Sequence, residues 1–290
     1  MGRETTALLD RIEELPPLPA VAARVMGMAD DNRTSALELA QVLSTDQALT
    51  AKLIKISNSA YYGFARRVST VREAVLVLGF KQVRQVAVGA SIMNTFRPSR
   101  PDEAFDLDLF WGHSVAVAVA AEAVAKRTRR AKPEDAFTAG ILHDIGRLVI
   151  RQVKPEKFEA AVALAQTGQC SLHAAELSIT GVAHDDVGRA LGEKWKFPAH
   201  LIDAVAGHHD PRLTLEDDGL SGIIAQCNRW VLHYGLYCGY DLEPAEPTPL
   251  PRDLEVIEQA CRGIDVVLDR AFSFIESASG TPNRWYAAAG

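Results

Sequence analysis

The sequence has few cysteines and no long uninterrupted apolar run. Its four cysteines form no CxxC pair, which argues against a thiolate zinc site and is typical of free thiols in a reducing compartment. The longest apolar stretch, Ser114–Ala125, is too short to span a bilayer and contains Glu122, so it predicts a buried helix. The first residues lack the apolar core of a secretory signal. We therefore expect a soluble, cytoplasmic protein that does not act at a membrane.

Signatures of a β-sheet are also missing, because no alternating runs are joined by two-residue hairpin turns. Helical periodicity runs through the chain, interrupted by a segment rich in proline and charge at 97–106 and by a proline-rich spacer at 243–251. The sequence thus predicts an all-α, two-lobed fold. The expected parts are an N-terminal helical lobe at 1–100, a second helical lobe at 101–240, and a spacer with a C-terminal helix at 241–290.

Charge is unevenly distributed along the chain. Residues 1–100 carry 13 Lys/Arg and 9 Asp/Glu, whereas residues 101–290 carry 18 and 28, so their net charges are +4 and −10. Between Lys52 and Arg84, seven basic residues accompany a single acidic one. Such a stretch is either a solvated face or a surface for an anionic partner. The charge pattern gives no support to sequence-specific binding of nucleic acid.

All eight histidines lie after residue 112, and several stand beside aspartate or another histidine. His143 and Asp144 are adjacent, and Gly146 just after them is compatible with a close approach of two helices. Neutral imidazoles and carboxylates are suitable ligands for zinc, iron, manganese or nickel. Two such ions about 3.5–4 Å apart can activate water against a phosphoester. The alternative is a hydrogen-bonded network in which imidazoles and the carboxylate satisfy one another.

The run His143-Asp144-Ile145-Gly146 resembles the signature of the HD superfamily of metal-dependent phosphohydrolases. The wider pattern resembles the HDOD branch of that superfamily, a bacterial signalling domain related to the HD-GYP phosphodiesterases. This resemblance covers roughly residues 10–240. It is carried by LPPLPAVAARVM, STDQALTAKLIKISNSAYYG, VREAVLVLGFKQVRQVAV, GVAHDDVGRALGEKWKFP and HHDP.

The resemblance implies an HD-type helical bundle for the second lobe and a divalent transition metal, either one ion or a binuclear pair. It places metal ligands at His113, His143, Asp144, His184, His208 and His209. The last ligand of the superfamily is an aspartate, and the matching position here is Asn228, which carries no charge. The GYP motif is also missing after the histidine doublet.

These features predict a bacterial signal-transduction module that binds metal and has weak or no hydrolase activity. Its expected partner is a signalling protein or a small nucleotide-like ligand. The alternative is a metal-dependent phosphohydrolase acting on a nucleotide or cyclic dinucleotide. Arg147 and Asn228 are weaker candidates for contacts to a phosphate or ligand, and an ordinary salt bridge is the alternative for Arg147. The remaining histidines are expected to be structural or exposed: His173, His200 and His233.

Overall fold

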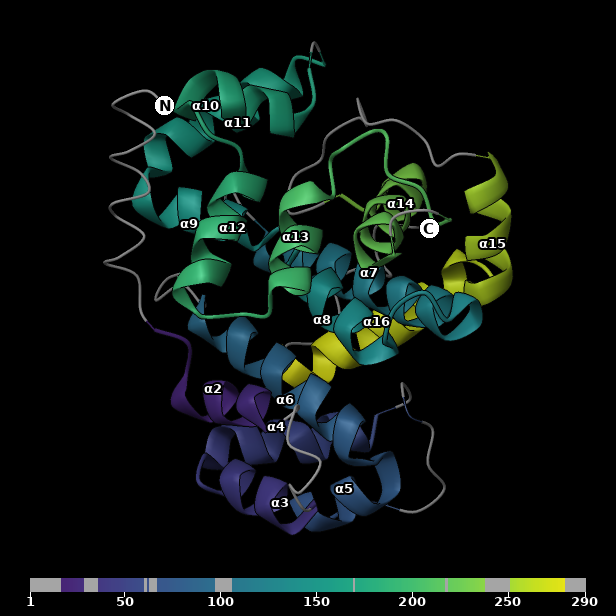
Figure 1. Cartoon of the computed structure of the whole chain (residues 1–290). Helices are drawn as coiled ribbons and strands as arrows, with labels where there is room; N and C mark the ends of the chain where they lie inside the picture. Colours follow the sequence, from purple (N-terminus) through teal and green to yellow (C-terminus); the bar gives the residue numbers. More distant parts are fainter. Residues whose placement is uncertain are drawn as a thin grey trace. The chain divides into compact units, whose positions relative to one another are not determined.

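A computed structural model shows the fold of the chain (Figure 1). It describes residues 17–28, 36–59, 62, 67–96, 106–168, 170–216, 219–237 and 251–279. Every regular element among these residues is an α-helix, so the prediction of an all-α chain is confirmed. Nearly all of the predicted boundary at 97–106 and of the spacer at 243–251 lies outside the described residues.

The chain divides into two compact units. One unit, called here the small unit, contains Leu18–Ser99 and the chain from Asp265 onward. The other, called the large unit, contains Arg100–Ile264. The chain therefore returns to the small unit after completing the large one.

The small unit is built from short amphipathic helices whose ends are set by capping residues. Asp46 accepts a hydrogen bond from the Leu49 backbone N–H, and Thr70 accepts one from Glu73 N–H. Gly79, with φ of +86°, separates the helix Val71–Leu78 from the helix Phe80–Thr95. The helices are α2 (Ala20–Gly27), α3 (Ala36–Ser44), α4 (Gln47–Ser57), α5 (Val71–Leu78), α6 (Phe80–Thr95) and, from Asp265, α16 (Ile264–Ser279).

The basic stretch between Lys52 and Arg84 lies in the small unit. Lys52 donates a hydrogen bond to the side chain of Asn94, and Lys55 donates one to the backbone carbonyl of Glu276. Other basic side chains of the stretch are exposed: Arg67, Arg72 and Lys81. Arg66 lies outside the described residues. Lys52 and Lys55 are therefore used within the unit, and binding of an anionic partner stays a prediction.

The large unit is organised around α7 (Leu107–Thr128), which packs against α8, α14 and α15. This helix is long and apolar enough to cross a membrane by length and composition, but 78% of its most apolar window is buried, as in a core helix. The other helices are α8 (Pro133–Leu142), α9 (Ile145–Val153), α10 (Pro155–Gln166), α11 (Leu172–Thr180), α12 (His184–Lys194), α13 (Ala199–Gly207), α14 (Gly219–His233) and α15 (Pro251–Cys261).

Two glycines permit the helix contacts that bring the histidines together. A Cβ on Gly140 would lie 2.4 Å from the Cα of Ala118, so α8 and α7 meet backbone to backbone. A Cβ on Gly146 would lie 1.9 Å from the carbonyl oxygen of His184, so α9 meets α12 in the same way. Between α8 and α9 the helix is broken at His143 and Asp144, which lets two consecutive side chains reach one place.

Candidate metal centre

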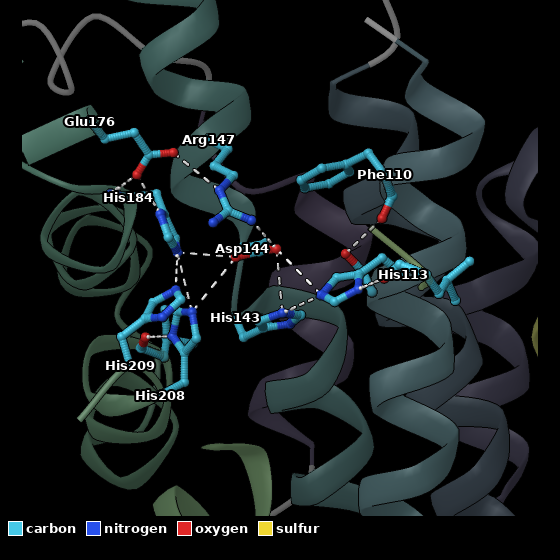
Figure 2. A network of polar contacts seen from close by, with 12 residues as sticks. Phe110, His113, His143, Asp144, Arg147, Glu176, His184, His208 and His209 are labelled. Carbon is cyan, nitrogen blue, oxygen red and sulfur yellow. Dashed lines mark hydrogen bonds and ion pairs between the residues drawn. The ribbon is translucent and has the colours of Figure 1, made fainter. Parts of the chain in front are cut away.

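The six residues predicted as metal ligands lie together in the large unit (Figure 2). They come from α7, from the break between α8 and α9, from the start of α12 and from the end of α13. Five of the six are buried, and His209 is half-buried. They form two groups that share Asp144, and within each group the candidate ligand atoms lie within 4.8 Å of one another.

The first group, called here the inner group, consists of His113, His143 and Asp144. The Nε2 atoms of the two histidines are 3.1 Å apart. They lie 3.5 and 3.4 Å, respectively, from Oδ2 of Asp144. Three ligand atoms therefore converge at this place.

The second group, called the outer group, consists of Asp144, His184, His208 and His209. Nε2 of His184 is 3.2 Å from Nε2 of His208 and 3.0 Å from Nε2 of His209. The other oxygen of Asp144, Oδ1, lies 3.1 Å from His184 Nε2 and 3.6 Å from His208 Nε2. Figure 2 shows Asp144 between the two groups, so a single carboxylate serves both.

Hydrogen bonds to the far side of three of the rings determine which nitrogen faces the centre. Nδ1–H donates to a backbone carbonyl in His113 (Leu236, 2.8 Å), His143 (Gly140, 2.8 Å) and His208 (Val205, 2.6 Å). In a neutral ring bonded in this way, Nε2 carries a lone pair and no proton. Lone pairs and a carboxylate therefore face one another, and Asp144 Oδ1 lies 3.1 Å from Nε2 of His184. A cation satisfies such an arrangement.

A buried carboxylate that sequence reasoning missed, Glu176 on α11, supports the centre from behind. It pairs with Nδ1 of His184 and accepts a 3.0 Å hydrogen bond from the His184 backbone N–H. Arg147 joins it to the ligands, donating to Asp144 Oδ2 at 2.6 Å and to Glu176 Oε1 at 3.1 Å. Arg147 thus makes a salt bridge, which was one of the two roles expected for it from the sequence. The other role, contact to a phosphate, stays a prediction.

Most of the candidate ligands are in the protonation state that a metal would require. Burial lowers the pKa of His113 to about 3 and that of His208 to about 4. Burial also lowers the pKa of His209 well below its usual value. Although burial opposes ionisation of Asp144, the charge of Arg147 and the contacts of the carboxylate with His143 and His184 outweigh it and hold the pKa of that carboxyl well below normal.

His184 differs from the other ligands. Burial and the Arg147 charge would lower its pKa, but the carboxylates of Glu176 and Asp144 outweigh them and raise that pKa to about 9. Without a metal, a proton on His184 supplies part of the positive charge that the centre needs. Metal binding at the outer group is therefore expected to displace this proton.

The stability of the metal-free protein is expected to peak near pH 6.5. For His113 and His208 the folded-state pKa values, about 3 and about 4, lie below the ordinary value of 6.5. As the pH falls from about 6.5 towards 4, these two histidines therefore gain protons only in the unfolded chain, and the folded state loses stability. For His184 the folded pKa of about 9 is raised, so its contribution is complete below about 6.5 and is lost as the pH rises through about 9. Urea unfolding in the presence of a chelator, at about pH 5, 6.5 and 8.5, measures this profile. A flat profile would contradict it.

Asn228 and the three remaining histidines do not belong to either ligand group. Asn228, on α14, is buried, and its Oδ1 has no hydrogen-bond partner among the described residues. His200 pairs with Asp135 at 3.1 Å with half of its side chain exposed, and His233 is exposed. His173 is partly buried, and its ring lies beside that of His209.

The amino-acid sequence matches a known family over most of the chain. The family model of the HDOD domain matches residues 15–211. The chain belongs to the HDOD family. The matched region of this HDOD chain includes all six ligand candidates, whereas Asn228 lies beyond it.

Solved structures resemble this HDOD chain over most of its length. A protein of Shewanella amazonensis SB2B, described as a candidate phosphohydrolase, is 25% identical with a TM-score of 0.71, covering 92% of this chain and 98% of that one. An HDOD protein of unknown function from Geobacter sulfurreducens has a TM-score of 0.71 at 24% identity, covering 95% and 97%. A candidate signal-transduction protein from Marinobacter aquaeolei VT8 has a TM-score of 0.73 at 22% identity, covering 93% and 65%. The last two likenesses support the fold alone.

A curated relative is an uncharacterised protein of Treponema pallidum (strain Nichols). It is 24% identical over 205 residues, which are 70% of this chain. The HDOD chain spans only 39% of that relative's length.

Proposed function

We propose that this HDOD chain is a signal-transduction module that holds a divalent transition metal and has weak or no hydrolase activity. The observation that carries the proposal is the convergence of imidazole lone pairs on the two oxygens of Asp144, with the far side of the rings already hydrogen-bonded. Buried acceptors that face one another are costly unless a cation pairs with them. A donor set of imidazoles and one carboxylate fits iron, manganese, zinc or nickel.

The two groups are unequally equipped to hold an ion. The outer group offers three imidazoles and a carboxylate oxygen, whereas the inner group offers two imidazoles and an oxygen that Arg147 already contacts. The position where the superfamily has a further aspartate is Asn228. We therefore expect the first ion in the outer group and a weaker second site in the inner group. This imbalance is the reason for expecting little hydrolysis, because a binuclear reaction needs both ions.

The alternative function is a metal-dependent phosphohydrolase acting on a nucleotide or cyclic dinucleotide. The sharing of Asp144 between two ligand groups favours it, because bridged pairs of ions are the arrangement that activates water against phosphoesters. A bound metal would make a coordinated water molecule more acidic. Arg147 in the large unit is a candidate for contact to an anionic ligand. The exposed basic side chains of the small unit are separate candidates for contact to an anionic ligand or signalling partner.

Metal content of wild-type protein purified without chelator, followed by a panel of phosphodiesters, tests the proposal. We expect about one ion per chain and little or no turnover. Substitution Asn228→Asp is expected to tighten binding of a second ion by roughly tenfold or more, because a carboxylate would replace a neutral amide where the superfamily has its last ligand. Titration calorimetry of chelator-treated protein measures both sites.

A matched control is Asn94→Asp, which places the same new charge in the small unit. It is expected to leave metal stoichiometry unchanged. Protein that holds no metal under any condition would contradict the proposal, and efficient turnover by the wild type would favour the phosphohydrolase.

A further inference from the structure

A second histidine–carboxylate pair flanks the outer group. His173 is the second residue of α11, and Asp185 directly follows the ligand His184 on α12. Nε2 of His173 lies 3.3 Å from Oδ1 of Asp185. The two side chains are 26% and 18% exposed, so the pair is partly shielded from solvent. Since Asp185 is in the same helical turn as His184, the turn that places a ligand also places the partner of His173.

The ring of His173 packs against the ring of His209. Their centroids are 4.4 Å apart and their planes are inclined by 32°, which is a tilted stack. His209 also contacts His208, at 4.2 Å between centroids, and directs its Nε2 at that of His184. Because His209 is the least buried of the six ligand candidates, its orientation depends strongly on what covers the ring.

We propose that His173, held by Asp185, is a positioning residue for His209. The stacked ring fixes the plane of the His209 imidazole so that Nε2 points into the outer group, and it limits access of water to that ligand. This inference rests on the proposed metal-binding function. Substitution of a residue that supports a ligand usually lowers metal affinity by about 10- to 100-fold.

The geometry assigns His173 a supporting place rather than a ligand's place. Its Nε2 lies at ion-pair distance, 3.3 Å, from Asp185 Oδ1, and the convergent atoms of the outer group belong to Asp144, His184, His208 and His209 in the described residues. A phenyl ring would therefore perform the same packing, whereas it could neither bind a metal nor carry a proton.

Cobalt(II) is the probe for the experiment, because its visible bands report the arrangement of the ligands. The full chain is loaded with cobalt, and both the spectrum and the rate of release to a chelator are measured for wild type, His173→Ala, His173→Phe and Asp185→Asn. We expect His173→Ala to shift the bands and to weaken binding by about 10- to 100-fold, mainly through faster release. His173→Phe should keep the wild-type bands and most of the affinity, and Asp185→Asn should fall between them.

The matched control is His200→Ala, which removes a histidine from another histidine–aspartate pair of the large unit. It should behave as the wild type does. Wild-type spectrum and release in His173→Ala would overturn the inference while leaving the proposed function intact. Equal losses in His173→Ala and His173→Phe would also overturn it, because they would indicate direct coordination. If wild-type protein binds no cobalt, the proposed function fails and the inference falls with it.

Discussion

Substitution Asp144→Asn is expected to remove metal from both ligand groups at once. Asp144 is the one residue that the inner and outer groups share: Oδ2 faces His113 and His143, whereas Oδ1 faces His184 and His208. An amide keeps the size of the side chain but loses the negative charge that offsets the cation. Affinity is expected to fall by more than about 100-fold, beyond the effect of losing a supporting residue. Elemental analysis and calorimetry measure the loss.

The same substitution is expected to destabilise the metal-free protein. Arg147 is buried and donates to Asp144 Oδ2 at 2.6 Å and to Glu176 Oε1 at 3.1 Å, so the change removes one of two buried carboxylates that face its charge. Breaking one partner of a buried ion pair costs about 3 kcal/mol or more. Urea unfolding with chelator present gives this value.

Single-ligand variants are the controls for the sharing of Asp144. In calorimetry, His143→Ala should abolish the weaker binding event of the inner group and spare that of the outer group, and His209→Ala should weaken the outer event and spare the inner one. If Asp144→Asn instead retains one ion per chain with wild-type affinity, Asp144 is not shared and the two-group description is wrong.

Substitution Gly146→Ala is expected to disrupt the centre without altering any ligand. The new Cβ would lie 1.9 Å from the His184 carbonyl oxygen and 2.9 Å from the Gly188 backbone nitrogen. Both obstacles are backbone, so α9 and α12 must separate by more than an ångström. Overpacking of this kind costs about 3 kcal/mol or more, which corresponds to a melting temperature lower by about 10 °C in a domain of this size. Because Asp144 precedes α9 and His184 begins α12, metal retention should fall as well.

A nearby glycine provides the control for Gly146. At Gly207, the last residue of α13, a Cβ would meet nothing closer than Leu213 Cδ1 at 3.7 Å, which is an ordinary contact. Gly207→Ala is therefore expected to match wild type in melting temperature and metal content. Equal behaviour of the two alanine variants would contradict the close approach of α9 and α12.

The helical class and the ligand candidates could be predicted because their signals are local. Periodicity and caps such as Asp46 specify helices over a few residues. The adjacent His143 and Asp144 can be identified as candidate metal ligands from their residue types alone. Gly146 could also be interpreted from sequence, because a glycine two residues after a pair of candidate ligands is compatible with a close approach of two helices.

The supporting residues could not be predicted, because their roles arise only from tertiary packing. Glu176 is an ordinary helical glutamate in the sequence, eight residues before His184, and no spacing rule connects them. His173 is interpreted from sequence as structural or exposed, and its contact with His209 depends on how α11 packs beside the end of α13. Likewise, the engagement of Lys55 by the Glu276 carbonyl joins residues 221 positions apart, which no local pattern encodes.

The hydrogen bond from His113 to the Leu236 carbonyl has a consequence for exchanging parts between HDOD proteins. The family match ends at residue 211, whereas the group that fixes the tautomer of His113 follows α14, at position 236. A chimera joined at residue 211 would supply every ligand of the inner group and yet pair His113 with a foreign carbonyl. The transferable piece of this protein therefore extends at least through Leu236.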